Sequence, residues 1–220
     1  MKYSYLSYPL NVADPHPPAI PAAELYDYMT VDKDGASVQI IKTANHTGTH
    51  LDTSAHVFND GIPITDFLPQ DLIFTEVALV DLRLSDEETV MPGQLEPYRE
   101  QLQNFEMAIF RFGVAEIRQK EPERFSNRLP GFGLESAQWL RDNLSNLRCI
   151  GTDLPSIATI AQLDITMRAH NILLAGREKR LIIEEMNVAG DLSGLCEVRI
   201  NPWMVKGMLS GPCSIIGIIK

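Results

Sequence analysis

The stretch HTGTHLDTSAH, residues His46–His56, contains three of the five histidines in the 220-residue chain, with Asp52 among them. Imidazole and carboxylate groups together suit zinc, manganese or iron. Side chains that only cap turns or bond to the backbone would explain one such histidine better than three with an aspartate. A metal site is therefore the leading interpretation of this stretch, and turn capping or a purely structural metal site are the alternatives.

Spacing limits how the stretch can surround an ion. The polar candidates occupy even positions, so they would share one face of an extended strand. His46 and His56 would then lie about 33 Å apart, at ~3.3 Å per residue. The chain must bend, and Gly48 is the easiest place. We expect a strand, a tight turn at Gly48 and a short helical segment in which Asp52 and His56 are one turn apart.

This arrangement predicts hydrolytic chemistry. We expect His46, His50 and Asp52 to surround a metal, with His56 beside it but not necessarily bound to it. A metal lowers the pKa of bound water towards ~7. A neighbouring free imidazole, with an ordinary pKa near ~6.5, exchanges protons near neutrality, so His56 is the candidate acid and base. Three local ligands leave coordination positions open, whereas structural zinc sites are usually closed by four.

Composition narrows the possible partners and setting. Hydrophobic residues make up 45% of the chain, charged residues 22%, and the formal net charge is -10. These values are typical of one globular domain spanning residues 1–220, and the charge argues against a nucleic-acid or anionic-membrane partner. We expect no signal peptide or membrane span. Three cysteines without a CxxC pair, Cys149, Cys196 and Cys213, indicate buried thiols and a cytoplasmic setting.

The remaining pattern predicts an α/β domain with a mixed sheet and flanking helices. No nucleotide-binding glycine motif is present. Five prolines in residues 9–22 predict an extended arm that covers the body or meets another subunit, and residues 113–133 have the composition of a long loop. Strands are predicted at 37–44, 76–82, 107–112, 148–152, 180–185, 196–200 and 214–219. Helices are predicted at 134–144, at 165–175 with Asp164 as its cap, and at 97–103.

The motif resembles the H-x-G-T-H-x-D-x-P-x-H signature of the putative cyclase family, which includes bacterial kynurenine formamidases and isatin hydrolases. Weaker resemblances follow along nearly the whole chain in the expected order. They are residues 6–10, 129–134 with the helix after them, 151–156, Ala169-His170, 182–184, Pro202 and Gly211-Pro212. The resemblance implies a swivelling β/β/α fold and a homodimer or homotetramer.

The resemblance also implies a fuller site. His46, His50 and Asp52 would bind a first metal, and Asp52 would bridge to a second, completed by His170 and Glu184. His56 would be the proton donor and acceptor. Without the resemblance, His170 would be a satisfied helix histidine and Glu184 a solvated carboxylate, with Glu185 its rival.

Two departures from the family pattern affect the expected substrate. Ser54 stands where the family usually has proline, which should loosen the turn. The arm also lacks the tryptophan that helps hold substrate in the formamidases, because Trp139 and Trp203 lie elsewhere. Neither change removes a ligand, but both weaken the case for N-formylkynurenine.

The resulting expectation is a hydrolase that cleaves a C–N bond in a small amide, with zinc as the expected metal and manganese as the alternative. Arylformamidase action on N-formylkynurenine, giving kynurenine and formate, is the leading reaction. Ring opening of an isatin-type cyclic amide, imide or lactone by a single-manganese enzyme is the alternative. A non-catalytic metal or small-molecule binding module and a subunit-assembly protein remain lower-ranked interpretations.

Overall fold

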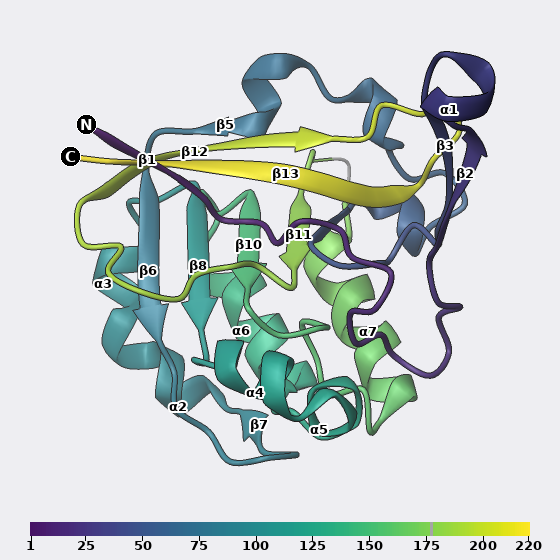
Figure 1. Ribbon diagram of the computed structural model, residues 1–220. Coiled ribbons are helices and arrows are strands. Elements are labelled where there is room, and N and C mark those ends of the chain that lie inside the picture. The colour runs from purple at the N-terminus through teal and green to yellow at the C-terminus, as the bar shows by residue number, and fades with distance from the viewer. Residues whose placement is uncertain (177) are drawn as a thin grey trace.

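A nine-stranded mixed sheet forms the centre of the computed structural model, which describes residues 1–176 and 178–220 (Figure 1). Its path is β5-β12-β13-β4-β11-β10-β8-β6, and β1 also pairs with β13. Strands β11, β10, β8 and β6 are parallel, whereas β4 is antiparallel to both of its neighbours. The bounds are β1 (Lys2–Tyr5), β4 (His50–Asp52), β5 (Ile73–Phe74), β6 (Val77–Asp81), β8 (Met107–Arg111), β10 (Cys149–Thr152), β11 (Leu181–Glu184), β12 (Leu195–Pro202) and β13 (Ser210–Ile219).

Helices and two small strand pairs surround this sheet. The α-helices are α1 (Val31–Asp34), α2 (Pro92–Leu95), α3 (Arg99–Leu102), α4 (Ala115–Lys120), α5 (Pro122–Asn127), α6 (Leu134–Asn143) and α7 (Leu163–Leu174). The 3-10 helices are η1 (Ser54–His56), η2 (Ile64–Asp66), η3 (Pro69–Leu72) and η4 (Glu96–Tyr98). The small pairs are β2 (Glu24–Met29) with β3 (Val38–Lys42), and β7 (Thr89–Val90) with β9 (Gly131–Phe132). Within the described ranges, no helix is long and apolar enough to cross a membrane.

The sheet buries apolar side chains on both faces. In β8, Ala108 and Phe110 join the cluster under α6 and α7, whereas Met107 and Ile109 join the opposite cluster. That second cluster includes residues of β12 and β13, which cross over the parallel strands (Figure 1). Coverage on both faces explains why β8 is a continuous apolar run. The thiols of Cys149 and Cys213 are buried and free, as expected, whereas Cys196 is free but only partly buried.

The predicted α/β class and mixed sheet are confirmed, and each predicted strand and helix has a counterpart. Residues 9–22 contain no helix or strand, as their prolines predict. The prediction missed the strands β1, β2, β4, β5 and β7 and the short helices α1 and α2, and α7 begins earlier than expected. Asp164 is therefore not its cap but lies in its first turn, after the N-cap residue Gln162.

The prediction of a long loop over residues 113–133 was wrong. This stretch contains α4, α5 and β9, and its apolar side chains Phe125 and Leu129 are buried in the core. Each helix has only six residues, which is too short to display a repeated apolar period in a charged sequence. Packing against the body therefore decides their structure.

Candidate metal centre

Strand β4, which lies between β13 and β11 in the central sheet, carries two of the predicted ligands, His50 and Asp52. Gly48 has a φ of +63°, and β4 begins two residues later. The predicted bend at Gly48 is therefore confirmed. Side chains alternate along β4, so Leu51 enters the core while His50 and Asp52 share the other face. In the antiparallel register, His50 lies directly opposite Glu184 of β11.

One local expectation was wrong. Asp52 does not begin a helical turn with His56, but ends β4, and the helical turn η1 starts only at Ser54. Strand pairing on both sides of β4, with β11 and β13, determines this conformation. The four-residue spacing of Asp52 and His56 gives no sign of this pairing, because the partner strands lie far away in the sequence. Ser54, where a looser turn was expected, is buried and accepts a hydrogen bond from the Ile62 N–H at 2.9 Å.

Strand β11 and helix α7 complete the centre. Glu184 ends β11, and its Oε2 lies 3.1 Å from His50 Nε2. Its Oε1 lies 3.1 Å from His170 Nε2, which projects from α7. Glu184 shares the strand face of Ile182, which packs in the cluster that also contains α7 residues. The structure thus brings together residues more than 100 positions apart in the chain.

Asp52 lies in the middle of the group and is fully buried. One carboxylate oxygen, Oδ1, is 3.2 Å from His46 Nδ1 and 3.9 Å from His50 Nε2, and Oδ2 is 3.5 Å from His170 Nε2. These contacts do not have hydrogen-bond geometry: neither oxygen, nor His50 Nε2, has a hydrogen-bond partner among the described residues. Buried polar atoms without partners are costly. A cation shared by these atoms would satisfy them, so the residues fit a divalent metal.

The backbone fixes which imidazole nitrogen faces the centre. His50 Nδ1 donates to the Gly48 carbonyl at 2.9 Å, and His170 Nδ1 donates to the Thr166 carbonyl at 2.8 Å. A carbonyl oxygen only accepts, so Nδ1 carries a proton in both rings. Nε2 of each ring is therefore directed at the carboxylates, which is the orientation that metal-binding histidines need.

The carboxylates also create a strongly negative field. Burial lowers the pKa of His50, but contact with Glu184 and the charge of Asp52 outweigh it and raise this pKa to about 9. Burial raises the pKa of Glu184, but contacts with His170 and His50 outweigh it and hold this pKa at about 2. Burial is likewise outweighed at the other two groups: Asp52 and Glu184 raise the pKa of His170, and His170 and His46 lower the pKa of Asp52. The centre therefore favours two carboxylates compensated by positive charge.

His46 and His56 form the partly exposed side of the centre. Their ring centroids are 4.3 Å apart, and the centroid of His56 is 5.6 Å from that of His170. Two groups of ligand atoms, each within 4.8 Å of one another, share Asp52: one joins it to His46 and His56, the other to His50 and Glu184. This division differs from the one implied by the resemblance, which pairs His50 with His46.

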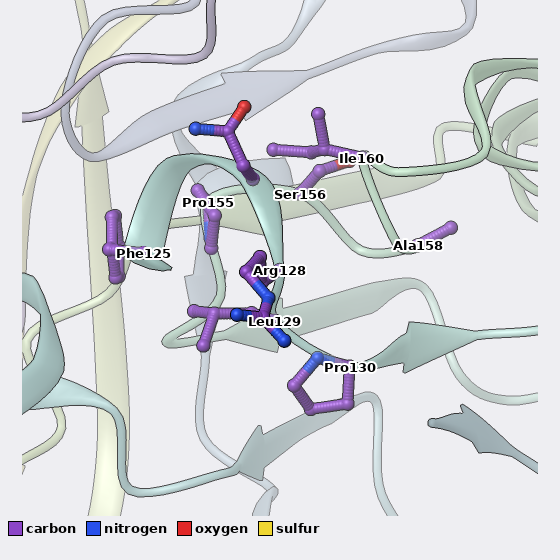
Figure 2. A pocket seen from close by; sticks show the side chains of 9 residues that line it. Phe125, Arg128, Leu129, Pro130, Pro155, Ser156, Ala158 and Ile160 are labelled. Atoms are coloured by element: carbon purple, nitrogen blue, oxygen red, sulfur yellow. The ribbon is translucent and has the colours of Figure 1, made fainter. Parts of the chain in front are cut away.

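The loop after β10 supplies a support that sequence reasoning did not assign to the site. Glu184 Oε1 accepts hydrogen bonds from the Ile157 N–H at 2.6 Å and from Ser156 Oγ at 3.3 Å. Ser156 also lines a small hollow beside α5, with Pro155 and Leu129 among its other walls (Figure 2). The 151–156 motif was the only sequence signal for this loop. Glu185, the rival of Glu184, does not face the centre and binds Arg118 instead.

Solved structures show the same fold. Isatin hydrolase A from Labrenzia aggregata, bound to benzyl benzoate, superposes with a TM-score of 0.83 at 16% sequence identity, covering 100% of this chain and 94% of that chain. At this low identity, the likeness concerns the fold.

Sequence comparisons identify relatives and a family. An uncharacterized protein of Haemophilus influenzae is 29% identical over 116 residues, 53% of this chain and 82% of the relative. Cyclase-like protein 2 of Arabidopsis thaliana is 27% identical over 181 residues, 80% of this chain but only 63% of that relative's length. The family model described as "Putative cyclase" matches residues 5–159, which include the motif and strands β4, β5, β6, β8 and β10 of the central sheet. The chain therefore belongs to the putative cyclase family.

Proposed function

We propose that this protein is a metal-dependent hydrolase that cleaves a C–N bond in a small amide. The observation that carries the proposal is Asp52, whose two buried oxygens lack hydrogen-bond partners and lie among three imidazoles and a second carboxylate. The family membership and the isatin hydrolase fold support hydrolysis.

The proposed metal ligands are His46, His50, Asp52, His170 and Glu184. Zinc is the expected metal and manganese the alternative, because imidazole and carboxylate suit both. Asp52 is shared by His50 and Glu184 on one side and by His46 on the other, which allows one ion or two. A bound divalent metal would polarise a carbonyl oxygen and make water a nucleophile near neutral pH.

His56 is proposed to move protons between water and the leaving nitrogen. It ends η1, is half-buried, and its ring contacts those of His46 and His170. Burial lowers the pKa of His56, and together with the neighbouring His46 and His170 it outweighs the charges of Asp52 and Glu184, which raise this pKa. The ring is therefore neutral near pH 7 and available to accept a proton. Thr53 fixes its position, because Thr53 Oγ1 accepts from the Ala55 N–H at the start of η1 and donates to the Leu209 carbonyl.

His56→Ala tests this role. With metal content unchanged, we expect hydrolysis to fall by about 100-fold or more, the size of a general acid–base contribution. His16→Ala is the matched control, because His16 belongs to the arm and its Nδ1 lies 3.2 Å from the Pro17 carbonyl oxygen, away from the motif. Undiminished hydrolysis would contradict the proton-transfer role, and loss of metal from His56→Ala would make His56 a ligand.

Two substrate classes are proposed. An aryl formamide, N-formylkynurenine, is the leading substrate because of the motif and the later Ala-His and Ile-Glu resemblances. A cyclic amide of the isatin type is the alternative, which the fold similarity to isatin hydrolase A favours. Assays of both with zinc- and manganese-loaded protein separate them. No turnover of formamides, cyclic imides or lactones with any divalent metal would favour a binding module instead.

We further propose that the protein acts as a homodimer or homotetramer. The β2–β3 hairpin supports this, because Leu25, Tyr26 and Tyr28 of β2 and Ile41 of β3 are all exposed. A two-stranded hairpin is marginally stable alone. Light scattering coupled to size-exclusion chromatography checks the oligomer, and Tyr26→Lys should shift it towards monomer. A monomeric wild-type protein at micromolar concentration would contradict this proposal.

A further inference from the structure

A second cluster of charges, mostly buried, begins at the residue that follows the metal-centre carboxylate Glu184. It consists of Arg118 on α4, Glu185 just after β11, and Asp14 on the proline-rich arm. The Arg118 guanidinium donates to Glu185 Oε1 at 2.8 Å through Nε and to Asp14 Oδ2 at 2.7 Å through Nη2. Arg118 and Glu185 are 7% and 3% exposed. We call this the Arg118 cluster, and the proposed reaction does not use it.

Glu185 is held by its backbone as well as its side chain. Its N–H donates to the Leu154 carbonyl at 2.7 Å, and its carbonyl accepts from Thr49 Oγ1 at 2.6 Å. Its φ is +56°, in the left-handed region that a non-glycine residue rarely adopts. Such strain persists only where the surroundings enforce it. Here the enforcing contacts come from three different parts of the chain.

These contacts link the metal centre to the arm. Thr49 precedes His50, and Glu185 follows Glu184, so one hydrogen bond joins the neighbours of two proposed ligands. Thr49 Oγ1 also accepts from the Tyr8 N–H at 3.0 Å, and Arg118 stacks over the Tyr8 ring at 4.0 Å from its centroid. The arm begins beside the sheet and then leads to the β2–β3 hairpin (Figure 1). The Arg118 cluster therefore fastens the arm and the turn at Glu185 together.

We propose that the Arg118 cluster positions the metal carboxylate Glu184, with Arg118 and Glu185 acting as positioning residues. Arg118 holds the Glu185 side chain away from the centre, which keeps the backbone in its left-handed turn and leaves Glu184 directed at His50 and His170. Without this pair, the turn relaxes and Glu184 loses its alignment. This inference rests on the proposed metal centre.

Metal affinity tests the inference without relying on catalysis. The dissociation constant of Co²⁺ and its visible absorption spectrum are measured for wild type, Glu185→Gln and Arg118→Lys, after circular dichroism has shown each to be folded. We expect Glu185→Gln to bind about 10- to 100-fold more weakly, the usual effect of losing a group that orients a ligand, with an altered spectrum. Arg118→Lys keeps the charge but not the forked donor, so it should bind Co²⁺ more weakly than wild type but more tightly than Glu185→Gln.

Arg111→Met is the matched control. Arg111 forms an equally short pair with Asp81, at 2.6 and 2.9 Å, and contacts none of the proposed ligands. Its Co²⁺ affinity should equal that of wild type. If Glu185→Gln or Arg118→Lys fails to fold, Asp14→Asn replaces it, with an expected loss of several-fold.

The outcomes separate the two proposals. Wild-type protein that binds no Co²⁺ would overturn the metal centre itself. Wild-type protein that binds Co²⁺, with folded variants that bind it within twofold and with the same spectrum, would overturn the positioning role alone. A fall in thermal stability with unchanged Co²⁺ affinity would make the Arg118 cluster purely structural.

Discussion

The metal centre and the Arg118 cluster are two buried groups of charge that begin at adjacent residues, Glu184 and Glu185. In the Arg118 cluster, each carboxylate receives an Arg118 N–H within 2.8 Å. In the metal centre, both Asp52 oxygens lack a hydrogen-bond donor among the described residues. A buried carboxylate is tolerated only when its charge is compensated. The chain supplies its own cation to one group and leaves the other suited to an added one.

Removing the central carboxylate should have the largest effect. Asp52→Asn keeps the shape of the side chain but removes the charge that both ligand groups share. We expect metal affinity to fall by more than about 100-fold, beyond the range for residues that merely orient ligands, and hydrolysis to disappear. Isothermal titration with Zn²⁺ measures this. Asp81→Asn, in a partly exposed ion pair, is the control, and equal losses in both variants would refute the special role of Asp52.

Removing the internal cation should cost stability. Arg118→Met leaves two carboxylates without their partner, and breaking a buried pair typically costs about 3–5 kcal/mol. Urea unfolding of metal-free protein measures the change. The double variant Arg118→Met/Glu185→Gln should regain part of the loss, because it no longer buries the Glu185 charge. A fall in the free energy of unfolding of less than about 1 kcal/mol would show that Arg118 and its carboxylates contribute no more than an ordinary surface ion pair.

Bound metal should stabilise the folded protein through the metal centre and not through the Arg118 cluster. At a free metal concentration of 100 times the dissociation constant, binding adds about 2.7 kcal/mol. For a chain of this size, that corresponds to a rise in melting temperature of roughly 5–11 °C. Differential scanning calorimetry with and without Zn²⁺ measures the rise. Asp52→Asn should show little of it, and an equal rise in that variant would place the binding elsewhere.

The smallest effect is expected from the support of Glu184. Ser156→Ala removes the 3.3 Å hydrogen bond to Oε1 but keeps the 2.6 Å bond from the Ile157 N–H. A hydrogen bond to a charged group contributes about 1.5–3 kcal/mol, and a bond this long belongs at the lower end, so metal affinity should fall by about 10-fold. Titration with Zn²⁺ detects this difference. A loss as large as that of Asp52→Asn would show that Ser156 is essential to the centre.

Local sequence was sufficient for much of the fold. The apolar stretches that form β8, β10 and β11 are buried on both faces, so they are visible as continuous apolar runs. In contrast, β4 is three residues long and carries two polar side chains. It is a strand only because β11 and β13 pair with it, and no local pattern shows that pairing.

The part of the candidate site that lies in one segment was predictable from local sequence, whereas its distant residues were not. The histidine-aspartate motif identified the segment, and Gly48 identified the bend. His170 and Glu184 came from the family resemblance, because a single histidine on a helix or a glutamate at a strand end has no distinctive local signal. Arg118 lies in a charged stretch that was predicted to be a loop. Its burial depends on contacts with Asp14 and Glu185, which are 104 and 67 positions away.

Anomalous diffraction from crystals of the metal-loaded protein, collected at the zinc and manganese edges, tests the metal centre most directly. We expect an anomalous peak beside Asp52, about 2.0–2.2 Å from its carboxylate and from the Nε2 of His50 or His170. A second peak across Asp52 would indicate two ions. The absence of any peak among these side chains, with metal bound elsewhere or not at all, would contradict the account.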